Sequence, residues 1–133
     1  MERKALVVDD DVYCLDIFIE YLQDKGFNVA SSLNPTCLLI EKKLAKCPMD
    51  VPCFGIILSD NQMPEMTGLE FFQYQSQRGC KIPVHRKALI SGDISPKERD
   101  IAEGMGCQLF QKPTSLESID AWIDSVLDER VNL

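Results

Sequence analysis

The segment FGIILSD (residues 54–60) is the most apolar stretch of the chain and ends in an aspartate. A short apolar run without a polar face is typical of a strand that is buried on both sides, as in a parallel sheet. The sequence that follows, NQMPEMTGLE (61–70), carries the spacing of a helix capping box at Thr67 and Glu70. This part of the chain therefore predicts a buried strand over 54–59, a loop that begins at Asp60, and a helix.

The same alternation extends in both directions from this segment. Apolar runs predict strands at 5–8, 27–30, 54–59, 88–90 and 108–111. Helical spacing and start signals predict helices after Asp11 and ending at Gly26, from Asn34-Pro35 to about Lys46, and from capping boxes at Thr67, Ser95 and Thr114. Five strands that alternate with five helices predict an α/β fold, in which helices cover both faces of a parallel sheet.

Composition limits the classes of protein to which the chain can belong. Its 133 residues fit a single domain over 1–133, and 14 basic against 21 acidic residues give a net charge of −7. That charge argues against nucleic acid and against an anionic membrane surface as partners. No apolar run approaches the length of a membrane span, and the start of the chain is too short for a signal peptide, so we expect a cytoplasmic protein.

Six cysteines and one histidine are scattered along the chain, without a Cys-x-x-Cys pair. Cysteines in this pattern are usually small apolar side chains in a reduced compartment, and we expect no function from them. The segment Pro83–Lys87 is interpreted as a solvated insertion, with a basic partner-binding loop as the alternative, and His85 as a surface residue. A further long irregular loop is expected near Cys47–Cys53.

Polar side chains follow four of the predicted strands. They are Asp9 and Asp10, Asp60, Ser91 and Lys112. The carboxyl ends of parallel strands share one edge of the sheet, where ligands bind, so these side chains should converge. Clustered carboxylates repel one another unless a cation joins them, and oxygen ligands suit Mg²⁺. An ammonium and a hydroxyl beside such a cation stabilise a phosphoryl group in transfer, which predicts that reaction class. Each motif alone is more often a turn or a helix cap; their joint placement favours the site.

Four motifs together resemble the receiver domain of bacterial two-component response regulators, of the stand-alone chemotaxis-regulator type. They are LVVDDD (6–11), LSDNQMPEMTGL (58–69), LISG (89–92) and KP (112–113). The resemblance implies a doubly wound, flavodoxin-like sheet with strand order 2-1-3-4-5. It implies that Asp60 accepts a phosphoryl group from the phosphohistidine of a sensor histidine kinase or phosphotransfer protein. Such a domain is not an enzyme in its own right and signals to a downstream protein by changing conformation.

The resemblance also assigns roles to the remaining site residues. Asp10 and Asp60 would bind Mg²⁺, for which Mn²⁺ could substitute, through their side chains; Gln62 would bind it through its carbonyl and Asp9 mainly through water. Ser91, Lys112 and the backbone N–H of Gly92 would contact the phosphoryl group. The Lys112–Pro113 bond is expected to be cis.

One position departs from the family pattern, and two other functions remain open. Leu109 occupies the place of the usual switch aromatic, and neighbouring Phe110 should point to the opposite face of its strand. The first alternative is a degenerate receiver that binds partners without being phosphorylated. The second is a phosphatase of the haloacid dehalogenase type, which would use Asp9-x-Asp11 but would leave residues 60–68 without a role.

Overall fold

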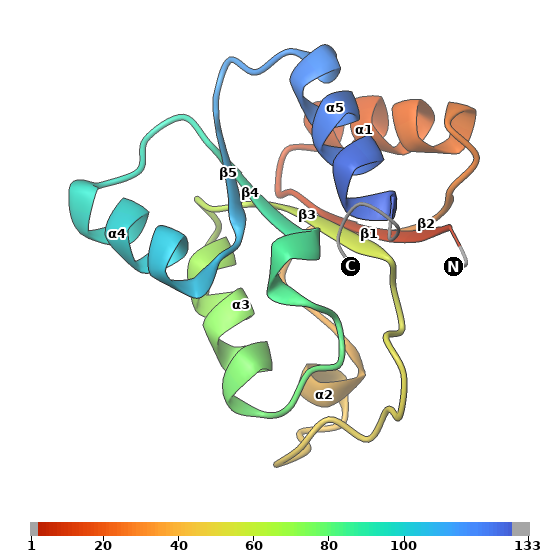
Figure 1. The fold of residues 1–133 in the computed structure, drawn as a ribbon. Helices are drawn as coiled ribbons and strands as arrows, with labels where there is room; N and C mark the ends of the chain where they lie inside the picture. The colour runs from red at the N-terminus through yellow and green to blue at the C-terminus, as the bar shows by residue number, and fades with distance from the viewer. Residues whose placement is uncertain (1–2, 129–133) are drawn as a thin grey trace.

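The computed structural model describes residues 3–128, which form a five-stranded parallel sheet in the order β2-β1-β3-β4-β5 (Figure 1). The strands are β1 (Lys4–Val8), β2 (Asn28–Ser32), β3 (Ile56–Asp60), β4 (Lys87–Ser91) and β5 (Gln108–Gln111). The predicted fold class and strand order are confirmed. The ends of the predicted domain, residues 1–2 and 129–133, lie outside the described part of the chain.

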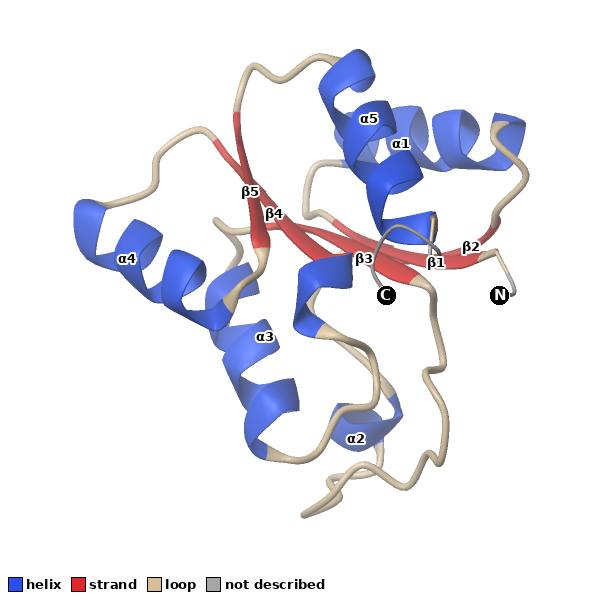
Figure 2. Cartoon of the chain, in the orientation of Figure 1, coloured by secondary structure: helices blue, strands red, loops and turns tan. Residues whose placement is uncertain are grey.

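Helices cover both faces of this sheet (Figure 2). They are α1 (Val12–Asp24), α2 (Leu38–Glu41), α3 (Gly68–Gln77), α4 (Pro96–Met105) and α5 (Leu116–Leu127), with a 3₁₀ turn η1 (Val84–Arg86) before β4. α1 and α5 lie on one face, and α3 and α4 lie on the other (Figure 1). Successive strand residues point to opposite faces, so Val7 of β1 joins the core beneath α1 and α5 while Leu6 joins the core beneath α3 and α4. Two apolar cores thus explain why the central strands are apolar throughout.

The predicted helix from Asn34 to Lys46 is wrong, because α2 comprises only Leu38–Glu41. Lys43 adopts a left-handed conformation with φ of 50°. The N–H of Lys43 donates to the carbonyl of Ile40, and the N–H of Leu44 donates to that of Leu39. This pair of hydrogen bonds is a Schellman motif, which ends the helix after four residues.

Two smaller predictions also need correction. The cap of α5 is Ser115, whose Oγ accepts from the N–H of Ser118, so the predicted capping box at Thr114 lies one residue too early. The segment Pro83–Lys87 is not a solvated insertion, because Arg86 and Lys87 are buried, although His85 is exposed as expected. Among the described helices, none combines the length and the apolar character that crossing a membrane requires.

Candidate functional site

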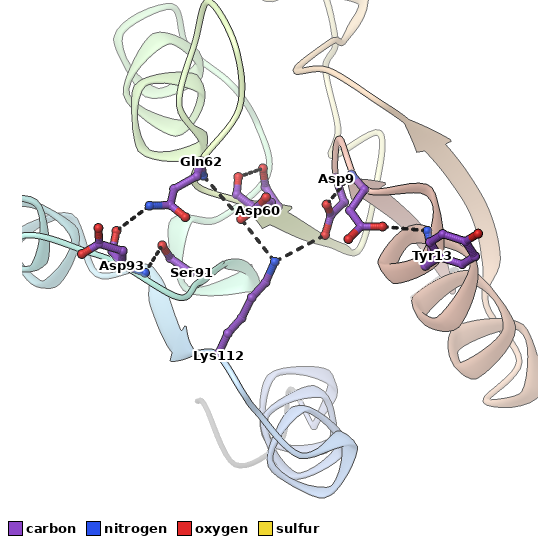
Figure 3. A network of polar contacts seen from close by, with 9 residues as sticks. Asp9, Tyr13, Asp60, Gln62, Ser91, Asp93 and Lys112 are labelled. Atoms are coloured by element: carbon purple, nitrogen blue, oxygen red, sulfur yellow. Dashed lines mark hydrogen bonds and ion pairs between the residues drawn. The ribbon is translucent and has the colours of Figure 1, made fainter.

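The predicted site residues lie together at the carboxyl edge of the sheet (Figure 3). Asp9 directly follows β1, Asp60 and Ser91 are the last residues of β3 and β4, and Lys112 directly follows β5. β3 and β4 pair in register, with Asp60 opposite Ile90, and the N–H of Lys112 donates to the carbonyl of Ser91 at 2.8 Å. The backbone pairing of the sheet therefore brings these distant positions to one place.

Three carboxylates form the negative part of this site. Asp9, Asp10 and Asp60 each offer an oxygen, and these oxygens lie within 4.8 Å of one another. Asp9 and Asp60 are buried, whereas Asp10 is exposed. An all-oxygen cluster that is open to solvent on one side suits Mg²⁺, which keeps several waters when it binds to protein carboxylates. The donor set therefore fits the cation that the sequence predicts.

Lys112 supplies the positive charge between two of these carboxylates. Its Nζ lies 3.6 Å from Oδ1 of Asp60 and 3.9 Å from Oδ2 of Asp9 (Figure 3). Burial raises the pKa of both Asp9 and Asp60, and the ammonium of Lys112 opposes that rise. Burial alone would lower the pKa of Lys112, but the two carboxylates outweigh it and raise that pKa. Three carboxylates face one ammonium in this cluster, so the cluster lacks positive charge without a bound cation.

Ser91 and Gln62 border the cluster on the side of β4. Ser91 is buried, and its Oγ accepts from the N–H of Asp93 at 3.3 Å. The N–H of Gln62 approaches Oδ1 of Asp60 at 3.4 Å, and its side-chain amide donates to the carbonyl of Asp93 at 3.2 Å. Gly92 lies between Ser91 and Asp93 in this exposed loop. The Ser91 hydroxyl and the backbone N–H groups of the loop after it thus lie near Asp60.

Asn61 connects the site to two helices, a role that the sequence analysis missed. Its Oδ1 accepts from the N–H of Leu69 in α3, and its Nδ2 donates to Oε2 of Glu98 in α4, both at 3.0 Å. Glu98 in turn accepts from the N–H of Ser95 as part of the capping box of α4. A capping Glu in α4 was visible in the sequence, but nothing there indicated that a side chain beside Asp60 would reach it.

Gly68 allows α3 to begin against the end of β3. A Cβ at this position would overlap the carbonyl oxygen of Asp60 and lie 2.7 Å from the side chain of Leu89. The N–H of Gly68 donates to the carbonyl of Asn61 at 3.1 Å. The glycine therefore sets how closely α3 approaches the segment that carries Asp60.

The strand β5 places its two middle residues as expected. Leu109 packs on the core beneath α3 and α4, whereas Phe110 is buried beneath α1 and α5 against Trp122. The Lys112–Pro113 bond is cis, as predicted. Asp11 accepts from the N–H of Tyr13 and caps α1, so it does not join the acidic cluster as a dehalogenase-type phosphatase would require.

Comparisons with known proteins agree with this fold. A receiver protein from Methanospirillum hungatei superposes with a TM-score of 0.76 at 22% identity, over 99% of this chain and 98% of that one. No protein-family model matches the chain. The chain is 28% identical to the putative two-component response regulator ARR21 of Arabidopsis thaliana, over 78% of its own length and 16% of the relative's. The chain folds as a response-regulator receiver domain.

Another curated relative is a transcriptional regulatory protein that is longer than this chain. The chain is 28% identical to the phosphoglycerate transport system transcriptional regulatory protein PgtA of Salmonella typhimurium, over 97% of its own length and 29% of the relative's. It spans less than a third of the length of these two relatives. The structural neighbours are receiver domains, so the dehalogenase alternative is not favoured.

Proposed function

We propose that this domain accepts a phosphoryl group on Asp60 from the phosphohistidine of a sensor histidine kinase or phosphotransfer protein. One observation carries the proposal: the ammonium of Lys112 lies between Asp60 and Asp9, within a cluster whose third carboxylate is Asp10. A carboxylate nucleophile, a cation-binding cluster and an ammonium at one edge of a parallel sheet are the parts that phosphoryl transfer needs.

The residues have distinct roles in this transfer. An oxygen of Asp60 attacks the phosphorus, the bond from phosphorus to the histidine nitrogen breaks, and an acyl phosphate forms on Asp60. Lys112 pairs with the incoming phosphoryl oxygens, while the Ser91 hydroxyl and the Gly92 N–H donate to them. Asp9, Asp10, Asp60 and the carbonyl of Gln62 would hold Mg²⁺, which supplies charge neutralisation when bound.

The proposal describes a signalling domain of the cytoplasm rather than an enzyme that acts on other molecules. Phosphorylation adds acceptors beside Ser91, whose Oγ accepts from the N–H of Asp93 and whose O–H then donates to the phosphoryl oxygens. The loop that carries Asp93 moves with it, which presents a changed surface to a downstream protein. The degenerate-receiver alternative predicts partner binding without any of these steps.

Labelling with a small phosphodonor tests the proposal directly. The wild-type domain, incubated with acetyl phosphate and Mg²⁺, should gain one phosphoryl group by intact mass, and Asp60→Asn should gain none. Asp11→Asn is the matched control, because the Asp11 side chain caps α1 and asparagine is an equally good cap. Stoichiometric labelling of Asp60→Asn, or no labelling of the wild type, contradicts the proposal.

A further inference from the structure

A second group of reactive side chains lies at the opposite end of β4 from Ser91, around Lys87. Lys87 is the first residue of β4 and has 0% exposed surface. Its Nζ donates to Oε1 of Gln75 at 2.9 Å and approaches Sγ of Cys80 at 3.5 Å. Within residues 3–128 no carboxylate forms an ion pair with it. A buried ammonium normally has an anionic partner, and the only contact of Lys87 that can become anionic is Cys80.

Cys80 is one of four cysteines around a small cavity. Cys37, Cys47, Cys53 and Cys80 line a space of about 20 Å³, and Gln75, the other partner of Lys87, also lines it. All four cysteines are partly exposed. The loop that carries Cys47 is tied to this place, because its N–H donates to the carbonyl of Arg78 at 2.8 Å. The cavity has room for about one water-sized molecule beside these thiols.

The side chain of Lys87 places its Nζ against the sulfur atom of Cys80. Burial lowers the pKa of Lys87, and negative charge at Cys80 acts in the opposite direction. When Nζ is an ammonium and Sγ is a thiolate, the two charges are in contact, and each charge offsets the burial of the other. The thiolate is the nucleophilic form of cysteine, and a neighbouring lysine favours it.

We propose that Cys80 is a peroxide-reactive thiol, that Lys87 activates it, and that Cys53 closes it into a disulfide. Cys53 lines the same cavity as Cys80, and the charge of Cys80 acts on Cys53 more strongly than that of Cys37 or Cys47 does. Burial, followed by the charge of Cys80, raises the pKa of Cys53, so Cys53 retains the proton that the second step consumes.

The chemistry balances with hydrogen peroxide as the oxidant. The Cys80 thiolate attacks one peroxide oxygen; the S–O bond forms, the O–O bond breaks, and the departing hydroxide takes a proton from the Lys87 ammonium to become water. The sulfur loses two electrons and becomes a sulfenic acid. Cys53 then gives up its proton and attacks that sulfur as a thiolate; the S–S bond forms, the S–O bond breaks, and the departing hydroxide takes the Cys53 proton to leave as water.

Four cysteines around one cavity could alternatively hold Zn²⁺, which binds four thiolates in structural sites. The described residues do not favour this occupant. In that part of the chain only Asp9, Asp10 and Asp60 gather their ligand atoms as one ion requires. Retained zinc is therefore an outcome that contradicts the proposal.

The experiment measures the oxidation rate of each cysteine in the intact protein. Reduced protein receives limiting hydrogen peroxide, with dimedone to trap sulfenic acid, and peptides are quantified by mass spectrometry. Cys14, which is partly exposed on α1, is the internal reference. We expect Cys80 to react at least about tenfold faster than Cys14. Lys87→Met should abolish this advantage, and the relative rates in the wild type decide the matter even where that variant does not fold.

Two serine variants identify the partner of Cys80. Cys53→Ser should accumulate the sulfenic acid of Cys80 without a disulfide, whereas the matched control Cys47→Ser should still form the Cys53–Cys80 bond. The reaction does not involve Asp60, so Asp60→Asn should oxidise as the wild type does. Equal rates at Cys80 and Cys14, a disulfide from Cys80 to another cysteine, or one zinc per purified chain with protected thiols would each overturn the assignment.

Discussion

At the scale of single residues, the buried carboxylate of Asp60 destabilises the fold in the absence of a cation. Its pKa is raised, chiefly by burial, so the folded state binds more protons than the unfolded state between the ordinary value of 3.8 and the raised value. Wild-type stability therefore gains a contribution as the pH falls through that window, and Asp60→Asn lacks it. Without divalent cations we expect Asp60→Asn to have the higher Tm at pH 7.5, and the difference to shrink as the pH falls toward 3.8. Thermal unfolding in EDTA measures the Tm of the wild type and of the variant at each pH. A Tm difference that grows as the pH falls would contradict this expectation. Mg²⁺ at pH 7.5 should reduce the Tm difference, because it binds to and stabilises the wild type.

Gly68 permits a second prediction at the residue scale. In Gly68→Ala the new methyl group meets the Asp60 carbonyl, so the start of α3 must move away from β3. Such overpacking costs about 1–3 kcal/mol of stability, and we expect slower labelling by acetyl phosphate because Asp60 moves with it. Gly104→Ala is the matched control: nothing lies within 4 Å of its Cβ, and alanine in α4 should stabilise the domain by about 0.5–1 kcal/mol. Urea unfolding measures the stability of both variants, and equal changes in stability would contradict the structure.

At the scale of elements, the sequence predicted the strands better than the loops between them. The five strands are short apolar runs whose pattern follows from burial, and register then places Asp60 and Ser91 at one edge. The early end of α2 could not be predicted, because Lys43 occupies a left-handed position that usually holds glycine. The burial of Lys87 within the segment predicted to be a solvated insertion could not be foreseen, because its partners, Gln75 and Cys80, come from tertiary packing rather than from neighbouring sequence. Local patterns do not contain such contacts.

The link from Asn61 to α4 was beyond prediction for the same reason. An asparagine after a strand is usually a turn residue, yet Asn61 is buried and joins the N-termini of α3 and α4. Its amide is the largest influence that lowers the pKa of Glu98, whose other carboxylate oxygen accepts from Ser95. The residue next to Asp60 is therefore coupled to the cap of α4 without any aromatic switch residue in β5.

At the scale of the whole molecule, the site lies between two separate cores and contacts them unequally. The core beneath α1 and α5 contains Phe110 and Trp122, whose ring centroids lie 6.0 Å apart at a steep angle. Asn61 instead bonds to α3 and α4, and the loop after Ser91 leads into α4. A ligand shifts a protein between two states only by its different contacts with each. Ser91 would make the new contacts with the phosphoryl group. The conformational change should therefore spread on the face of the sheet that α3 and α4 cover.

Hydrogen exchange measures where that response goes. On addition of beryllofluoride, a phosphoryl mimic, with Mg²⁺, we expect the largest protection in residues 91–96 and at the start of α4. The hydrogen exchange of β5 should change weakly. Leu109 is smaller than an aromatic ring, so a smaller side chain has to move behind Ser91. α5 should change least, since Phe110 and Trp122 belong to the other core. The same additions to Asp60→Asn are the control and should have no effect. If β5 and α5 changed as strongly as residues 91–96, the signal would cross the sheet, and Phe110, whose ring is the one aromatic of β5, would have to carry it.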